Sequence, residues 1–208
     1  MPDFQLEKSA LSQGYRAIAG LDEAGRGALF GPVVAAAVVF PPAEIEGRIR
    51  DWMCEINDSK QLSPRKRQRL CRLILQHAQS VGWGMASNVE IEEQNIHWAS
   101  LESMRRSIGR LSEEPDFLLV DGFRLNGVHY PQEKVPQGDK KSITIAAASI
   151  VAKVLRDEIV VHLDRIFEGY SLAKHKGYGT REHYQALRKL GPTVFHRRSF
   201  NLKDRADL

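Results

Sequence analysis

Two apolar runs near the N-terminus, joined by a glycine-rich stretch, place the strongest limit on the fold. Residues Tyr15–Leu21 read YRAIAGL, and residues Pro32–Phe40 read PVVAAAVVF before a second proline ends the run. Short valine-rich runs bounded by glycine or proline are typical of buried strands. The stretch between them contains Gly25-Arg26-Gly27, which favours a turn. We therefore predict two adjacent strands that form a hairpin at the start of a sheet.

Downstream of this hairpin, predicted helices alternate with predicted strands. Ser63 is a good N-cap residue and Pro64 suits the first position of a helix. The patterns predict helices over 63–79, 89–111, 143–167 and 181–190, and strands over 80–87, 117–120 and 133–137. The alternation favours a mixed α/β sheet with helices on both faces. The 208 residues fit a single domain, 1–208, in which the region from about 168 to 208 is a helical, basic appendage.

Charge is unevenly distributed along the chain. The formal net charge is +4, and residues 174–208 carry nine Lys or Arg against three Asp or Glu. A basic segment beside a slightly acidic body suggests that a polyanion binds across one end of the molecule. A solvated basic tail explains the same excess equally well.

The chain shows no feature of a secreted or membrane protein. Its first 14 residues lack the apolar segment of a signal peptide, and no apolar run approaches the ~20 residues that span a bilayer. Cys54 and Cys71 have no metal-binding spacing and are expected to be free thiols. We therefore expect a monomeric, cytoplasmic protein without a membrane partner.

Acidic residues stand where predicted strands end. Asp22 and Glu23 follow the first strand, Asp121 follows a later buried strand, and Asp139 follows the last one. Clustered carboxylates repel one another unless a cation lies between them, and oxygen ligands without histidine or cysteine suit Mg²⁺ or Mn²⁺. Two such ions ~4 Å apart catalyse phosphodiester cleavage. Asp22 and Glu23 can share such a site only if their strand ends there, because neighbours in a strand point to opposite faces. Any one of the 26 acids could instead be an ordinary turn former.

Three further segments have the composition of nucleic-acid contacts. Gly25 and Gly27 would let the backbone approach a phosphate or a sugar, although they also suit an ordinary hairpin turn. Ser59 and Lys60 offer a hydroxyl and an ammonium group to a phosphate, or form a plain polar turn. Tyr178 lies among basic residues and could stack on a base or sugar, or pack on the protein body.

Taken together, these segments resemble the ribonuclease HII family. The resemblance extends from about Tyr15 to His183, and its motifs occur in the family's order. They are GLDEAGRGALFGPVVAAAV (20–38), NDSKQLSPRKR (57–67), LLVDG (118–122), GDKKSITIAAASIVAKVLRD (138–157) and KHKGYGTREH (174–183). The first and fourth motifs are long and specific.

The resemblance implies an RNase H-like fold and an endoribonuclease that cuts the RNA strand of RNA/DNA hybrids and cuts 5′ of ribonucleotides embedded in duplex DNA. It implies two-metal catalysis with Mn²⁺ or Mg²⁺ that leaves 3′-hydroxyl and 5′-phosphate ends. The implied catalytic and metal-binding residues are Asp22, Glu23, Asp121 and Asp139, and the implied substrate-binding residues are Gly25, Arg26, Gly27, Ser59, Lys60 and Tyr178.

Two positions depart from the family's usual pattern. Gln137 stands where many relatives have lysine, and Ala28 stands where many have proline. Neither change removes an expected ligand, but both alter local charge or rigidity. The related ribonuclease HIII is disfavoured because no additional substrate-binding domain precedes Asp22.

Two other functions suit a fold of this kind. A non-catalytic nucleic-acid-binding domain would lack one of the four acids, and none is missing here. A structure-selective DNA nuclease would not need the Gly25-Arg26-Gly27 loop. The sequence therefore favours the ribonuclease.

Overall fold

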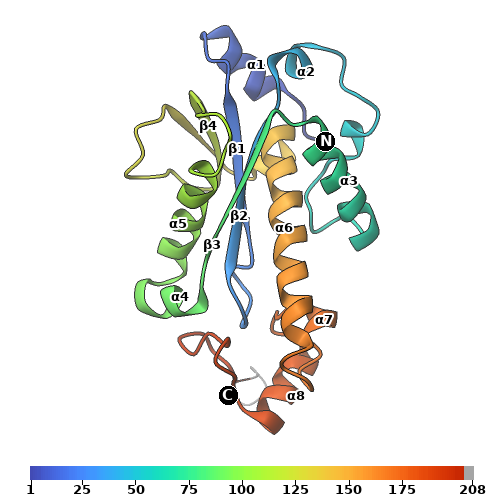
Figure 1. Ribbon diagram of the computed structural model, residues 1–208, viewed down its shortest axis with the longest axis vertical. Coiled ribbons are helices and arrows are strands. Elements are labelled where there is room, and N and C mark those ends of the chain that lie inside the picture. Colours follow the sequence, from blue (N-terminus) through green and yellow to red (C-terminus); the bar gives the residue numbers. More distant parts are fainter. Residues whose placement is uncertain (204–208) are drawn as a thin grey trace.

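A mixed five-stranded sheet forms the centre of the computed structural model, which describes residues 1–203 (Figure 1). The strands are β1 (Ile18–Ala24), β2 (Val33–Val39), β3 (Ser80–Ala86), β4 (Phe117–Asp121) and β5 (Gln132–Val135), in the order β3-β2-β1-β4-β5. The first three are antiparallel neighbours, and β4 and β5 continue the sheet in parallel with β1. The predicted hairpin and the mixed sheet are confirmed.

Helices cover both faces of this sheet, as the alternating pattern predicted. Helix α5 (Ile96–Ile108) packs on one face, and α6 (Ile143–Asp164) crosses β1 and β2 on the other with α3 (Pro64–His77) beside it (Figure 1). The remaining helices are α1 (Gln5–Ser12), α2 (Pro42–Glu46), α4 (Asn88–Gln94), α7 (Leu172–His175) and α8 (Arg181–Leu190), with 3₁₀ turns η1 (Met53–Glu55) and η2 (Gly138–Lys140). None of the helices within residues 1–203 is long and apolar enough to cross a membrane.

Several boundaries differ from the sequence-based expectation by a few residues, as where α6 ends at Asp164 and β5 at Val135. The helix expected over 89–111 is divided at Asn95, whose φ of 79° lies in the left-handed region and whose side chain caps α5 through the N–H groups of His97 and Trp98. This cap starts a new helix at Ile96, so the predicted helix is not continuous. Strand β1 continues to Ala24 instead of ending at Leu21, so Asp22 and Glu23 lie inside it.

The close contact between β1 and α6 depends on Gly20. A Cβ atom on Gly20 would lie 2.5 Å from the backbone carbon of Thr144 in α6. The start of α6 is rich in alanine and fully buried, so the helix backbone can lie directly against the strand. This approach sets the position of α6 residues relative to Asp22, two residues along β1 on the same face.

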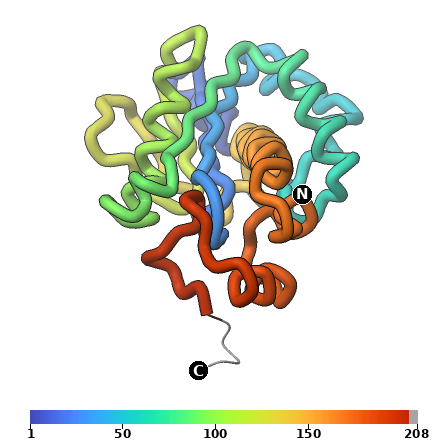
Figure 2. The backbone as a smooth tube through the Cα atoms, turned by 60° about the horizontal axis from the view of Figure 1, so that its bottom comes forward, coloured from blue at the N-terminus to red at the C-terminus, as the bar shows by residue number. Residues whose placement is uncertain are grey.

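The C-terminal region is only partly the helical appendage that we expected. After α8 the chain is irregular, and it passes beneath the tip of the β1–β2 hairpin (Figure 2). Its backbone pairs with that tip, because Arg197 N–H donates to the Leu29 carbonyl and Gly31 N–H donates to the Phe195 carbonyl. The segment therefore belongs to the fold of the hairpin; the expectation for residues 204–208 lies outside the described residues.

Candidate functional site

Asp22 and Glu23 occupy the part of β1 that extends beyond its pairing with β4. That pairing ends with Leu21 opposite Val120, while pairing with β2 continues as far as Ala24. Asp121 is the next residue of β4 after Val120 and stands beside this free edge of β1. The two neighbours keep the alternation of a strand, yet repulsion from Asp121 contributes to raising the pKa of both. We expected Asp22 and Glu23 to share a site only if β1 ended there. Instead, β1 continues, and it is the pairing with β4 that ends at Leu21.

The carboxylates of Asp22 and Glu23 are buried without enough positive charge to balance them. Burial, followed by repulsion from Glu23 and Asp121, raises the pKa of Asp22 well above its ordinary value. Burial also raises the pKa of Glu23 to about 7, against the opposing effect of Arg26, whose guanidinium lies 3.6 Å away. The Oε2 atom of Glu23 is buried without a hydrogen-bond partner among the described residues. Such a site favours a bound cation.

Asp139 is held next to Asp121 by the backbone. The N–H of Gly138 donates to Oδ1 of Asp121 at 2.6 Å, which ties η2 to the end of β4. The pKa of Asp139 is raised by burial and by repulsion from Asp58 and Asp121. Asp58 therefore belongs to the same acidic region, where Lys60 partly offsets the charge of Asp121 and Asp139.

Ser149 is a site residue that sequence reasoning missed. It lies in the buried first half of α6, where its hydroxyl lowers the pKa of the Asp22 carboxyl, and it shares a 2.9 Å hydrogen bond with the hydroxyl of Ser59. Ser59 itself is buried, so its side chain reaches the acidic region through Ser149. A serine in an alanine-rich, buried helix was the only trace of this contact in the sequence.

The four acids approach one another without forming a closed cage. Within residues 1–203, no three carboxylate, imidazole or thiol groups are gathered closely enough to hold a metal ion by themselves. Mg²⁺ commonly keeps several waters and binds one or two carboxylates together with substrate phosphates. The arrangement therefore suits an ion whose coordination is completed from outside the protein.

The glycine-rich loop begins where β1 ends. The N–H of Ala28 donates to the carbonyl of Gly25, which closes a tight turn, and Gly25 has a φ of 100° that favours glycine. A proline at position 28 could not make this hydrogen bond. Gly27 is exposed, and a Cβ atom there would meet nothing within 4 Å. The guanidinium of Arg26 lies 4.5 Å from the centre of the Phe123 ring. The loop thus presents an open face at Gly27.

Tyr178 lies beside this loop. It pairs with Ala28 in an antiparallel bridge, and Gly177 accepts a hydrogen bond from the N–H of Leu29. Its half-buried ring faces two cations, with Lys153 Nζ at 5.0 Å and Arg156 Cζ at 5.2 Å from the ring centre. The structure therefore brings together the glycine loop and the tyrosine, two segments that are 150 residues apart in the chain.

Three histidines hold the backbone of the Tyr178 segment. The Nδ1 atom of His183 donates to the Tyr178 carbonyl at 3.0 Å, and its Nε2 atom accepts from Nε2 of His196, also at 3.0 Å. The Nδ1 atom of His196 accepts from the N–H of Thr193. His175 donates through Nε2 to the Tyr170 carbonyl and accepts the N–H of Gly177. Each ring uses one donor and one acceptor, which requires all three rings to be neutral.

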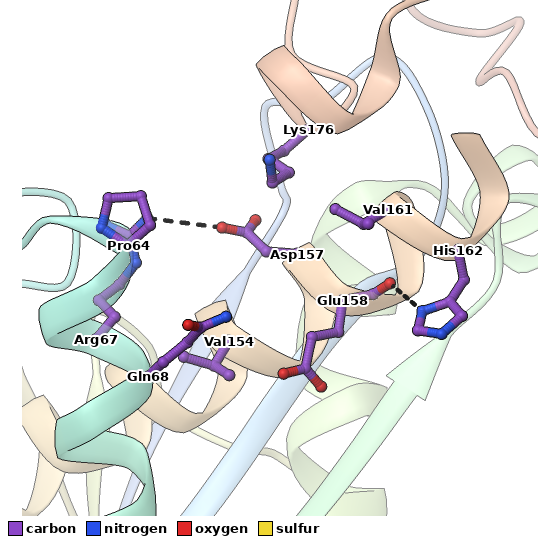
Figure 3. Close-up of a pocket in the computed structure, with 9 residues that line it drawn as sticks. All are labelled: Pro64, Arg67, Gln68, Val154, Asp157, Glu158, Val161, His162 and Lys176. Atoms are coloured by element: carbon purple, nitrogen blue, oxygen red, sulfur yellow. Dashed lines mark hydrogen bonds and ion pairs between the residues drawn. The ribbon is translucent and has the colours of Figure 1, made fainter. Parts of the chain in front are cut away.

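A pocket of about 210 Å³ opens between α3 and α6, close to the Tyr178 segment (Figure 3). Asp157 forms ion pairs on its rim with Arg67 at 3.7 Å and with Lys153 at 2.8 Å. Lys176 extends over the pocket from the loop after α7. Asp157 is already paired with two cations, and we assign no ligand to the pocket.

Comparison with known proteins shows the family of the chain. Residues 19–203 match the family model of ribonuclease HII. The ribonuclease HII of Moorella thermoacetica is 47% identical over 194 residues, which cover 93% of this chain and 91% of that protein.

Solved structures show the same fold at lower identity. Ribonuclease H2 from Pyrococcus horikoshii OT3 is 23% identical with a TM-score of 0.72, over 89% of this chain and 94% of that one. Bst-RNase HIII in complex with Mn²⁺ is 18% identical with a TM-score of 0.65, over 93% of this chain and 70% of that one. The expected RNase H-like fold is confirmed. By its match to the family model and its identity to a relative over nearly its whole length, the chain belongs to the ribonuclease HII family and is a ribonuclease H.

Proposed function

We propose that this protein is an endoribonuclease that hydrolyses the RNA strand of RNA/DNA hybrids and cuts on the 5′ side of ribonucleotides embedded in duplex DNA. The observation that carries the proposal is the placing of a buried, undercompensated acidic region next to an open glycine loop and a half-buried tyrosine. The acidic region can organise phosphodiester hydrolysis, and the glycine loop with the tyrosine can contact the sugar.

Asp22, Glu23, Asp121 and Asp139 are the residues proposed to hold the divalent cation, Mg²⁺ or Mn²⁺. Their chemistry fits, because all donors are carboxylate oxygens and Oε2 of Glu23 is buried without a partner among the described residues. The same fold is known in a complex with Mn²⁺ in Bst-RNase HIII. When bound, two such ions would activate the attacking water and stabilise the leaving 3′-oxygen, which leaves 3′-hydroxyl and 5′-phosphate ends.

The other residues of the site prepare this chemistry. Ser149 is proposed to favour the charged form of the Asp22 carboxylate, and Gly138 orients the carboxylate of Asp121. Lys60, which lies beside the acidic region, is proposed to bind a backbone phosphate next to Ser59, whose buried hydroxyl bonds to Ser149. These contacts act on any nucleic-acid backbone and do not select a sugar.

Selection of the sugar is assigned to the loop and to Tyr178. Only the 2′-hydroxyl or the helix shape distinguishes an RNA strand from a DNA strand. The open face at Gly27 lets main-chain groups reach a ribose, with Gly25 and Arg26 shaping the turn. Tyr178 would press on the sugar to the 3′ side, where a deoxyribose fits better. A cut at a single embedded ribonucleotide would begin its excision from replicated DNA, and we propose this role for the enzyme. We further propose that the enzyme is cytoplasmic and monomeric.

The test is cleavage of a labelled DNA duplex that carries one ribonucleotide, with and without added Mg²⁺ or Mn²⁺. We expect a single cut 5′ of the ribonucleotide, a 3′-hydroxyl end, and no cutting of the all-DNA duplex. Cleavage that survives excess EDTA would remove the metal-dependent mechanism. Equal cutting of both duplexes would indicate a DNA nuclease instead.

A further inference from the structure

Two fully buried arginines lie beneath the glycine-rich loop. Arg156 and Arg197 are both 0% exposed, and neither pairs with a carboxylate of the described residues. A buried charge without a counter-ion is costly and needs other compensation. Burial, followed by repulsion from nearby Arg156, lowers the pKa of Arg197 to about 9. Such a costly arrangement calls for a role beyond packing.

Carbonyl oxygens of the loop provide most of the compensation. Arg156 donates to the carbonyls of Pro32, Phe30 and Lys176 at 3.0–3.1 Å. Arg197 donates to the carbonyl of Gly31 at 3.0 Å and to that of Arg26 at 2.9 Å. Arg156 therefore ties the far side of the hairpin to the Tyr178 segment, while Arg197 reaches the Arg26–Gly27 peptide itself.

The orientation of this peptide determines which group faces outward. The C=O and N–H of a trans peptide point in opposite directions, and the described chain contains no cis peptide. Because the Arg26 carbonyl points inward to Arg197, the N–H of Gly27 points away from the buried guanidinium. Within residues 1–203 this N–H donates to no other group, and Gly27 is exposed. It is a free donor on the open face of the loop.

We propose that Arg197 is a positioning residue for recognition of the 2′-hydroxyl. It holds the Arg26–Gly27 peptide in the one orientation that turns the Gly27 N–H toward the sugar. The inference rests on the proposed function, in which this loop reads the ribose. Under this proposal Arg197 maintains the shape of the loop and is not one of the cations of the C-terminal segment that contact phosphates.

The test compares Arg197→Gln and Arg197→Lys with the native enzyme. For each we would measure the KM of a duplex with one ribonucleotide and the Ki of the same duplex made entirely of DNA as a competitor. We expect the KM to rise about three- to tenfold, the value of one neutral hydrogen bond, with an unchanged Ki. Lysine should behave like glutamine, because it lacks the planar fork whose Nε and Nη1 atoms donate to the carbonyls of Gly31 and Arg26.

The matched control is Arg198→Gln, which removes the same charge from the exposed neighbouring position. It should change KM and Ki together if it changes either. An Arg197→Gln variant that keeps the native ratio of Ki to KM would overturn the proposal, and so would a lysine variant that keeps it. If native enzyme binds both duplexes equally, the proposed reading of the 2′-hydroxyl fails instead.

A second measurement does not depend on the stability of the variants. In native protein with the metal chelated, hydrogen exchange at the Gly27 amide should be fast in the free state. The single-ribonucleotide duplex should slow it, and the all-DNA duplex should not. Slow exchange at Gly27 in the free protein would show that its N–H is not available, which would contradict the inference.

Discussion

The N–H of Gly138 donates to Oδ1 of Asp121 at 2.6 Å, and this one contact joins the end of β4 to the turn that carries Asp139. Two acids from separate elements are thereby held side by side. An asparagine at position 121 could accept the same hydrogen bond through its own oxygen. The substitution therefore tests the charge of the site with little effect on its shape.

Asp121→Asn should reduce turnover by at least about a hundredfold while hybrid binding is preserved, because the cation would lose a ligand. The same change removes repulsion among buried acids, so the metal-free variant should be more stable than the native protein. Each kcal/mol gained in the free energy of unfolding should raise the melting temperature by about 2–4 °C. Differential scanning calorimetry with and without Mg²⁺ measures this effect. Glu133→Gln, at an exposed position of β5, is the control. Near-native turnover in Asp121→Asn would remove Asp121 from the site.

The two glycines of the loop should respond differently to alanine. At Gly27 the new Cβ meets nothing within 4 Å, so Gly27→Ala should keep its melting temperature and raise the KM for the ribonucleotide duplex by blocking the sugar. At Gly25 the Cβ would lie 1.9 Å from Arg156 Nε and φ is 100°, so Gly25→Ala should lose stability by about 1–3 kcal/mol. Thermal melts and steady-state kinetics separate the two. A destabilised Gly27→Ala variant would contradict the open face.

Tyr178→Ala should impair cleavage at a single embedded ribonucleotide more than cleavage of a long hybrid, by about 1–3 kcal/mol if stacking is lost. The backbone contacts of this segment to Ala28, His175 and His183 do not involve the ring, so the loop should remain in place. Tyr178→Phe keeps the aromatic face and is the control. Equal losses on both substrates would indicate that the ring only packs the loop.

The histidine network should make stability depend on pH. Burial lowers the pKa of His183 and of His196 to about 4, whereas both titrate near 6.5 in the unfolded chain. The unfolded state therefore binds more protons between pH 6.5 and 4, and stability falls as pH is lowered through this range. Urea unfolding at a series of pH values measures the slope.

His183→Asn isolates this contribution, because Asn can still donate to the Tyr178 carbonyl but cannot take up a proton. The raised pKa of Glu23 acts in the opposite direction, since it stabilises the fold as pH falls below about 7. Only the difference between native and variant slopes therefore reports on the histidines. A His183→Asn variant with the native slope would show that His183 does not titrate below its ordinary pKa.

Local sequence patterns determined the elements and the residue types of the candidate site. Short apolar runs bounded by glycine or proline predicted the strands, and apolar spacing with capping residues predicted the main helices, because burial leaves its trace in every segment of chain. The acids, the glycine loop and Tyr178 were recognisable from their motifs. One predicted helix was wrong because a single side chain interrupts it. The side chain of Asn95 caps α5 and so separates it from α4.

Tertiary structure alone decided which residues support these motifs. Ser149 lies beside Asp22 because Gly20 lets α6 lie against β1, and Arg197 reaches the Arg26 carbonyl across 171 positions of sequence. Such contacts depend on the register of strands and the depth of helix packing, which are properties of the assembled layers. A local pattern records that a side chain is buried, but the partner it meets is chosen only when the layers come together.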